Sequence, residues 1–143
     1  VMKRILCLLI GVLPSLTFAA EDMRQLVKMS PEARAELRAE MLDFQTAISS
    51  IIAALGEGKF ADAAETAETQ IGISAMGRHR SAPPNARPGM FMPAEMHAIA
   101  RGMHAAGSDF AKVARAGDTA KALAALTAVT GACVSCHRSY RTQ

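Results

Sequence analysis

The sequence predicts an all-α protein folded as a four-helix up-and-down bundle. Three observations predict this fold. Apolar residues recur at alternating spacings of three and four along several stretches, segments rich in Gly and Pro separate those stretches, and no stretch shows the strict alternation of a β-strand. The chain has 143 residues and is 50% hydrophobic, which suits one globular domain.

The first long helix is expected over residues 31–55, after a lead-in of mixed charge over residues 21–29 that is helical or frayed. Ser30 and Pro31 form a good start, because serine caps a helix and proline is tolerated at the first helical position. Gly56 and Gly58 end it. Its inward stripe is Leu37, Met41, Phe44, Ile48, Ile51 and Leu55.

The other three helices are expected over residues 60–75, 94–116 and 119–140. The second is rich in alanine, so its neighbours can approach closely. Residues 77–93 contain four prolines and form the crossover to the third helix. Asp118 is placed to cap the last helix, whose inward stripe ends with Cys133, Cys136 and Tyr140. These helices complete the up-and-down bundle.

The last helix ends in Cys133-Val134-Ser135-Cys136-His137, the C-x-x-C-H pattern by which c-type haem is attached. Two thiols three residues apart lie on one helical turn, so each can add across one haem vinyl group. The histidine that follows then supplies an imidazole as axial ligand. We therefore expect one covalently bound haem c per chain, with His137 as an iron ligand and both cysteines holding the porphyrin.

Two other interpretations of the cysteines compete with haem attachment. A redox-active C-x-x-C pair normally follows a strand and opens a helix, whereas this one closes an alanine-rich stretch. A zinc site needs about four ligands, and the remaining cysteine, Cys7, lies in a segment expected to be removed. Both interpretations are weaker than haem attachment.

A cluster of methionine and histidine offers a separate metal hypothesis. Thioethers and imidazoles together suit copper. Met96 and Met103 also fit the core stripe of the third helix, where methionine packs well against irregular surfaces, and this second interpretation is the stronger one. The cluster consists of Met90, Met92, Met96, His97, Met103 and His104.

Residues 1–19 are expected to be a signal peptide, which leaves residues 20–143 as a single domain. Lys3 and Arg4 precede a short apolar run, and Thr17-Phe18-Ala19 offers small residues for cleavage. The apolar run is too short for a stable membrane anchor. Removing the segment takes the formal charge from +3 to +1, which gives no support for nucleic-acid binding.

The sequence resembles the class II c-type cytochromes, or cytochrome c′ group. The resemblance rests on the C-terminal position of the haem motif, on the four helices, and on the ending C-x-x-C-H-x-x-aromatic-Arg, matched through Tyr140 and Arg141. Residues 58–64 also look like the first interhelix turn of the family. The resemblance implies a periplasmic protein, commonly a homodimer, with His137 as the proximal ligand and Arg141 one turn later on the proximal side of the haem.

The same resemblance implies two functional groups, and Met41 decides between them. Counting back from Asp62, Met41 stands where low-spin electron carriers of the family have their distal methionine. Alternatively Met41 is a core residue, Leu42 faces an open iron, and the protein binds nitric oxide or carbon monoxide. Arg38, one turn before Met41, is either a haem-propionate partner or a plain surface residue.

The expected function is therefore electron transfer with redox partner proteins, and gas binding is the alternative. Basic residues of the crossover, Arg78, Arg80 and Arg87, suit an acidic partner, although a solvated loop is the ordinary state of such a segment. An enzyme is not expected. No paired acids or distal histidine accompany the expected iron site, as peroxide chemistry would require.

Overall fold

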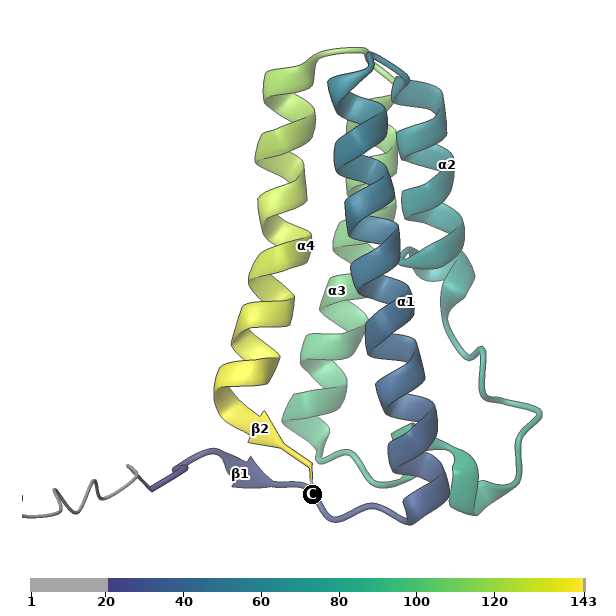
Figure 1. Cartoon of the computed structure of the whole chain (residues 1–143), viewed down its shortest axis with the longest axis vertical. Helices are drawn as coiled ribbons and strands as arrows, with labels where there is room; N and C mark the ends of the chain where they lie inside the picture. The colour runs from purple at the N-terminus through teal and green to yellow at the C-terminus, as the bar shows by residue number, and fades with distance from the viewer. Residues whose placement is uncertain (1–20, 143) are drawn as a thin grey trace, which may run out of the picture.

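The computed structural model describes residues 21–142, and in this part of the chain four α-helices run up and down along one long axis (Figure 1). This arrangement confirms the predicted all-α bundle. The expected signal peptide, residues 1–19, lies outside the described residues. The helices are α1 (Pro31–Gly56), α2 (Phe60–Gln70), α3 (Ala94–Ala114) and α4 (Thr119–Ser139).

The start of α1 is capped as its sequence predicts. The Ser30 hydroxyl accepts a hydrogen bond from the amide of Ala33 at 3.0 Å and also donates to the carbonyl of Asn85 in the crossover. The helix ends one residue beyond the predicted position, and the turn that follows contains Gly58 with φ of 70°, where glycine is favoured. The cap therefore also fixes the crossover to the base of α1.

Helix α2 is shorter than predicted, because it ends at Gln70 and not near residue 75. The amide of Gly72 reaches back to the carbonyl of Ala67 at 2.8 Å, and a short 3₁₀ turn η1 (Ile73–Ala75) follows. Gly72 lies directly against Gly107 of α3, and the Ser108 hydroxyl accepts from the amide of Ile73 at 2.9 Å. Contacts with α3 thus end the helix where its local sequence would continue it.

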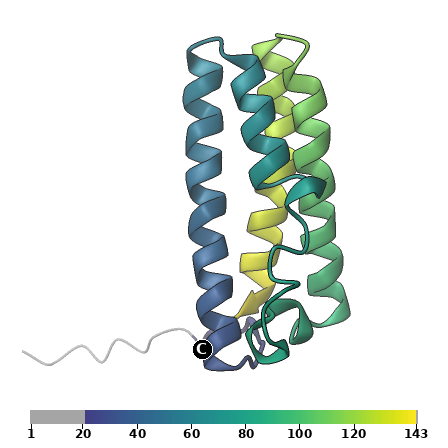
Figure 2. The same cartoon turned by 90° about the vertical axis from the view of Figure 1, so that its right-hand side faces the viewer.

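The crossover between α2 and α3 lies against α1. Figure 2 shows it descending from α2 to the end of the bundle where α3 begins. It contains the 3₁₀ turns η2 (Pro84–Ala86) and η3 (Pro88–Met90). Arg78 pairs with Asp43 at 3.1 Å, and His79 lies between Glu36 at 3.5 Å and Glu40 at 3.6 Å. Part of its basic charge is therefore matched by acidic groups on α1.

The four helices do not approach one another equally. Close backbone packing joins α3 to α4, α1 to α2 and α2 to α3, whereas the backbones of α1 and α4 stay further apart. Of the aromatic side chains in the described part of the chain, Phe44 and Phe110 are buried. The core consists mainly of alanine and aliphatic side chains. Few large side chains are therefore present to fill the space between α1 and α4.

Two short strands that the sequence did not predict join the ends of the described chain. β1 (Gln25–Leu26) pairs in parallel with β2 (Tyr140–Arg141), and the amide of Val27 donates to the carbonyl of Arg141 at 2.8 Å. The lead-in is therefore extended, not helical, and α4 ends one residue before the predicted position because Tyr140 enters a strand. This pairing lies at the end of the bundle where α4 finishes (Figure 1).

Helix α4 is the one helix within residues 21–142 that is long and apolar enough to cross a bilayer, with a mean hydropathy of 1.4 over its best window. Length and composition alone do not separate such a span from an apolar bundle helix. In the structure α4 packs along α3 and carries the C-x-x-C-H motif, as a helix of the bundle does.

Candidate functional site

The two cysteines of the motif lie on the inward side of the last turns of α4. Both are half-buried free thiols, and they continue the stripe of buried residues formed by Leu126 and Val129. Cys133 packs against the hydrophobic core, and its thiol donates to the carbonyl of Val129 at 3.5 Å. Both thiols thus belong to the last two turns of α4, three residues apart.

The environment of these thiols does not suit disulfide chemistry. Burial raises the pKa of Cys133, and burial together with the neighbouring Cys133 raises the pKa of Cys136. Redox-active thiol pairs instead have lowered pKa values, because the thiolate is the attacking species. The raised pKa values therefore argue against a catalytic dithiol.

His137 occupies the last turn of α4, and its side chain is exposed. Its imidazole makes no hydrogen bond within residues 21–142. Across the same residues, no group of three or more His, Cys, Asp or Glu side chains is arranged to hold a metal ion. The imidazole is thus available to bind a metal that a porphyrin holds.

Met41 and Leu42 lie on different sides of α1. Met41 is partly buried and packs against the same hydrophobic core that Cys133 joins, whereas the side chain of Leu42 is 64% exposed. Figure 1 shows that α1 begins at the end of the bundle where α4 finishes, so the half of α1 that carries Met41 lies toward the haem motif. Of these two residues, Met41 is the one that faces the interior.

These residues together fit a covalently bound haem. Two free thiols lie on one helical face, a histidine follows without a side-chain partner, and a methionine faces the interior from α1. The helices that carry these residues, α1 and α4, have backbones further apart than those of the pairs α3–α4, α1–α2 and α2–α3.

The two arginines predicted at the site are placed differently. Arg38 is exposed on α1, one turn before Met41, as expected. Arg141 does not lie one helical turn after His137, because the chain leaves the helix at Tyr140. Its Nε donates to the carbonyl of Arg24 at 3.3 Å and lies 3.7 Å from a carboxylate oxygen of Asp22.

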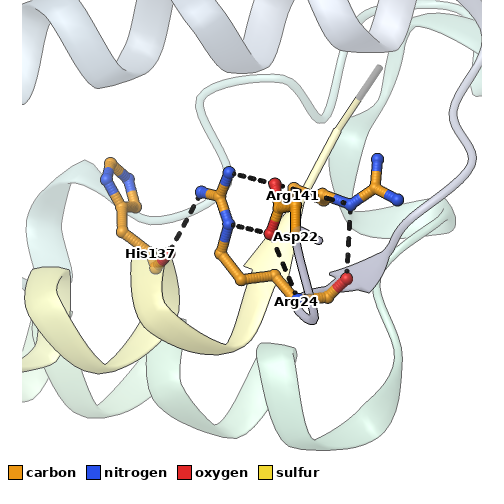
Figure 3. A network of polar contacts seen from close by, with 4 residues as sticks. All are labelled: Asp22, Arg24, His137 and Arg141. Atoms are coloured by element: carbon orange, nitrogen blue, oxygen red, sulfur yellow. Dashed lines mark hydrogen bonds and ion pairs between the residues drawn. The ribbon is translucent and has the colours of Figure 1, made fainter. Parts of the chain in front are cut away.

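Asp22 and Arg24 lie beside the end of α4 at His137, and the sequence did not predict this placement (Figure 3). Arg24 Nη1 donates to the backbone carbonyl of His137 at 3.3 Å, while its Nε and Nη2 donate to Asp22 at 2.9 and 2.6 Å. The hydrogen bonds that Asp22 accepts from Arg24 lower the pKa of Asp22 to about 2. Residues 22–27 show no periodic pattern in the sequence, so nothing local indicated that they contact the end of α4.

The members of the methionine–histidine cluster that lie on α3 have packing roles, whereas Met90 is 67% exposed in the crossover. Met96 and Met103 are 6% and 8% exposed and belong to the core. His97 Nε2 contacts the carbonyl of Gly89 at 2.7 Å, and His104 Nδ1 contacts the carbonyl of Ile71 at 2.5 Å. Both rings fasten the connecting segments to α3, and the arrangement gives no support for copper.

Comparison with known proteins gives one match. A family model described as Cytochrome C' matches residues 20–141. No curated protein and no solved structure matches the chain.

Proposed function

The chain belongs to the cytochrome c′ family, whose members bind covalently attached haem c, and we propose that it carries single electrons in the periplasm. Family members are typically periplasmic and generally not enzymes. When bound, the haem iron alternates between the ferric and ferrous states and so supplies the one-electron chemistry. In this proposal Cys133 and Cys136 hold the porphyrin by thioether bonds, His137 is the proximal iron ligand, and residues 1–19 direct export before removal.

The observation that carries the electron-transfer proposal is the inward position of Met41. With haem bound, the Met41 thioether would be the side chain that binds the iron opposite His137 and shields it from water, which would keep the rearrangement on electron transfer small. The exposure of Leu42 argues against its being the distal residue. Arg38 and Arg141 are assigned to the haem surroundings, Arg38 toward a propionate and Arg141 on the proximal side.

Gas binding is the second candidate, because the inward position of Met41 also suits a residue that does not bind iron. Met41 packs against the hydrophobic core, as a methionine with a purely structural role does. In that arrangement the distal face of the iron stays open, and nitric oxide or carbon monoxide binds there.

The absorption spectrum of the ferric protein, wild type beside Met41→Ala, tests the two candidates. Electron transfer predicts a low-spin wild type with the weak far-red band of methionine-ligated haem, and slow uptake of carbon monoxide by the ferrous form. Met41→Ala is then expected to become high-spin and bind carbon monoxide faster, because the variant has no thioether to compete for the iron. Covalent haem is retained.

Leu42→Ala is the matched control, because it shortens the neighbouring side chain of the same helix turn. Since Leu42 is largely exposed, its spectrum and gas uptake are expected to equal those of the wild type. Wild-type and Met41→Ala spectra that are alike and high-spin contradict electron transfer and support gas binding.

We further propose that the protein is a homodimer that meets redox partner proteins. Large apolar side chains remain exposed on two helices, at Leu42 and Ile52 of α1 and at Leu123 and Val134 of α4. Light scattering of the purified holoprotein is expected to give the mass of two chains. A mass of one chain at all protein concentrations contradicts the dimer.

A further inference from the structure

The end of α4 leaves backbone carbonyls without helical partners, as every helix end does. The amide of Tyr140 closes the turn by donating to the carbonyl of Cys136. The next carbonyl, that of His137, has no such amide, because residues 140–141 are extended in β2. It accepts instead from the guanidinium of Arg24, a residue 113 positions earlier in the chain.

Arg24 is itself held in place from two sides. Its guanidinium forms a two-pronged contact with the carboxylate of Asp22, at 2.9 and 2.6 Å. Its backbone carbonyl accepts from Arg141 Nε at 3.3 Å, and the parallel pairing of β1 with β2 fixes the segment alongside Tyr140 and Arg141. Figure 3 shows the resulting chain of contacts running from Arg141 through Asp22 and Arg24 to His137.

We propose that Arg24 is a positioning residue for His137, and that residues 22–27 form a proximal clamp that sets the orientation of its imidazole and the reduction potential of the haem. The inference rests on the proposed role of His137 as the proximal ligand but not on ligation by Met41. Groups that hold a ligand from outside orient it and tune the metal. The imidazole makes no hydrogen bond of its own within the described chain, so the backbone is where the protein holds this residue.

The charges of the clamp predict the direction in which each substitution changes the reduction potential. A positive guanidinium on the proximal side favours the ferrous form, which carries one positive charge fewer, and the Asp22 carboxylate opposes that effect. Loss of Arg24 is therefore expected to lower the reduction potential, and loss of the Asp22 charge to raise it. Both changes release the same clamp, so both are expected to disturb the imidazole in the same way.

The test compares the purified holoproteins Arg24→Gln and Asp22→Asn with the wild type. Lys28→Gln is the matched control, because Lys28 is exposed in the same segment and its loss removes the same charge as Arg24→Gln. The measurements are the midpoint potential and the NMR shifts of the haem methyl groups in the ferric protein, which depend on the orientation of the imidazole plane.

Arg24→Gln is expected to lower the ferrous-to-ferric ratio at a fixed potential by about threefold to tenfold, tenfold being 59 mV for one electron. Asp22→Asn is expected to shift it in the opposite direction. The haem methyl shifts should change in both variants and stay as in the wild type in Lys28→Gln.

Methyl shifts in Arg24→Gln and Asp22→Asn that match those of Lys28→Gln overturn the proposal. Faster hydrogen exchange at the end of α4 with unchanged potential and methyl shifts also overturns it, because it indicates a purely structural strap. Both readouts exist for low-spin and high-spin iron. Failure of the clamp is therefore distinguishable from failure of Met41 ligation, which the wild-type spin state reports.

Discussion

Asp22 is an acidic residue whose pKa is lowered in the folded protein. Its hydrogen bond with the Arg24 side chain lowers its pKa from 3.8 to about 2, and Arg141 adds to the effect. A carboxyl with a depressed folded pKa stabilises the fold above its unfolded pKa, and this contribution is lost as the pH falls through the folded pKa. Because Asp22 is exposed, solvent screening keeps the contribution small.

We therefore predict that the clamp opens between pH 3.8 and about 2, and stays closed above that window. The amide of Val27, which donates to Arg141 of the opposite strand, reports this opening through its NMR shift during an acid titration. The expected midpoint lies near the folded pKa of Asp22. A midpoint at the ordinary carboxyl value contradicts the prediction, and Asp22→Asn serves as the control that lacks the titrating group.

Among single residues, the sequence predicted those whose motif is local and missed those whose hydrogen-bond partner lies far along the chain. Cys133, Cys136 and His137 were identified because three neighbouring positions on one helix carry the whole pattern. Arg24 was not identified, since its partner lies 113 positions away and a two-residue strand leaves no periodicity. Nothing local marks a residue whose function depends on where the other end of the chain lies.

Helices α2 and α3 meet where two glycines allow their backbones to touch. A Cβ added at Gly107 would come within 3.0 Å of the backbone nitrogen of Gly72. A Cβ added at Gly102, on the same helix, would meet no atom within 4 Å. Alanine favours a helix interior over glycine by roughly 0.8–1.0 kcal/mol, so the two positions separate helix propensity from close packing.

We predict that Gly102→Ala stabilises the protein by about 0.5–1 kcal/mol, through helix propensity alone. Gly107→Ala is expected to destabilise it by about 1–3 kcal/mol, because the methyl group pushes against backbone that cannot rotate away. Urea denaturation of the two holoproteins measures both values. Equal stabilisation by the two substitutions contradicts the close contact and indicates that α2 can move away from α3.

The helix starts were predicted well where a capping residue in the sequence sets them. Ser30 caps α1 and Asp118 caps α4, the latter accepting from the amide of Lys121 at 3.0 Å, and both helix starts were predicted. The end of α2 was predicted wrongly, because the contact of Gly72 with α3 sets it and an alanine-rich sequence does not show such contacts. Local caps are visible in a sequence, whereas packing between elements is not.

For the whole molecule, the number and direction of the helices followed from periodicity, but their unequal spacing did not. An up-and-down bundle with short turns places α1 and α4 as neighbours. The structure keeps the backbones of α1 and α4, which carry Met41 and the haem motif, further apart than those of the other neighbouring helices. Since Phe44 and Phe110 are the buried aromatic residues among those described, protein side chains supply little of the bulk that the space between α1 and α4 needs.

We predict that the chain without haem is much less stable than the holoprotein. In Cys133→Ala/Cys136→Ala no thioether bond forms, and the apolar sides of α1 and α4 lose a large planar group to pack against. A group that associates only with the folded bundle stabilises it, and covalent attachment keeps that group permanently at hand. The expected loss is about 3–5 kcal/mol, comparable with truncating a large core side chain, and urea denaturation followed by circular dichroism measures it.

Ser135→Ala is the control, because Ser135 is exposed between the two cysteines and its substitution leaves the haem attached. If the double variant unfolds cooperatively at the same urea concentration as Ser135→Ala, the bundle is complete without haem and the spacing of α1 and α4 has another cause.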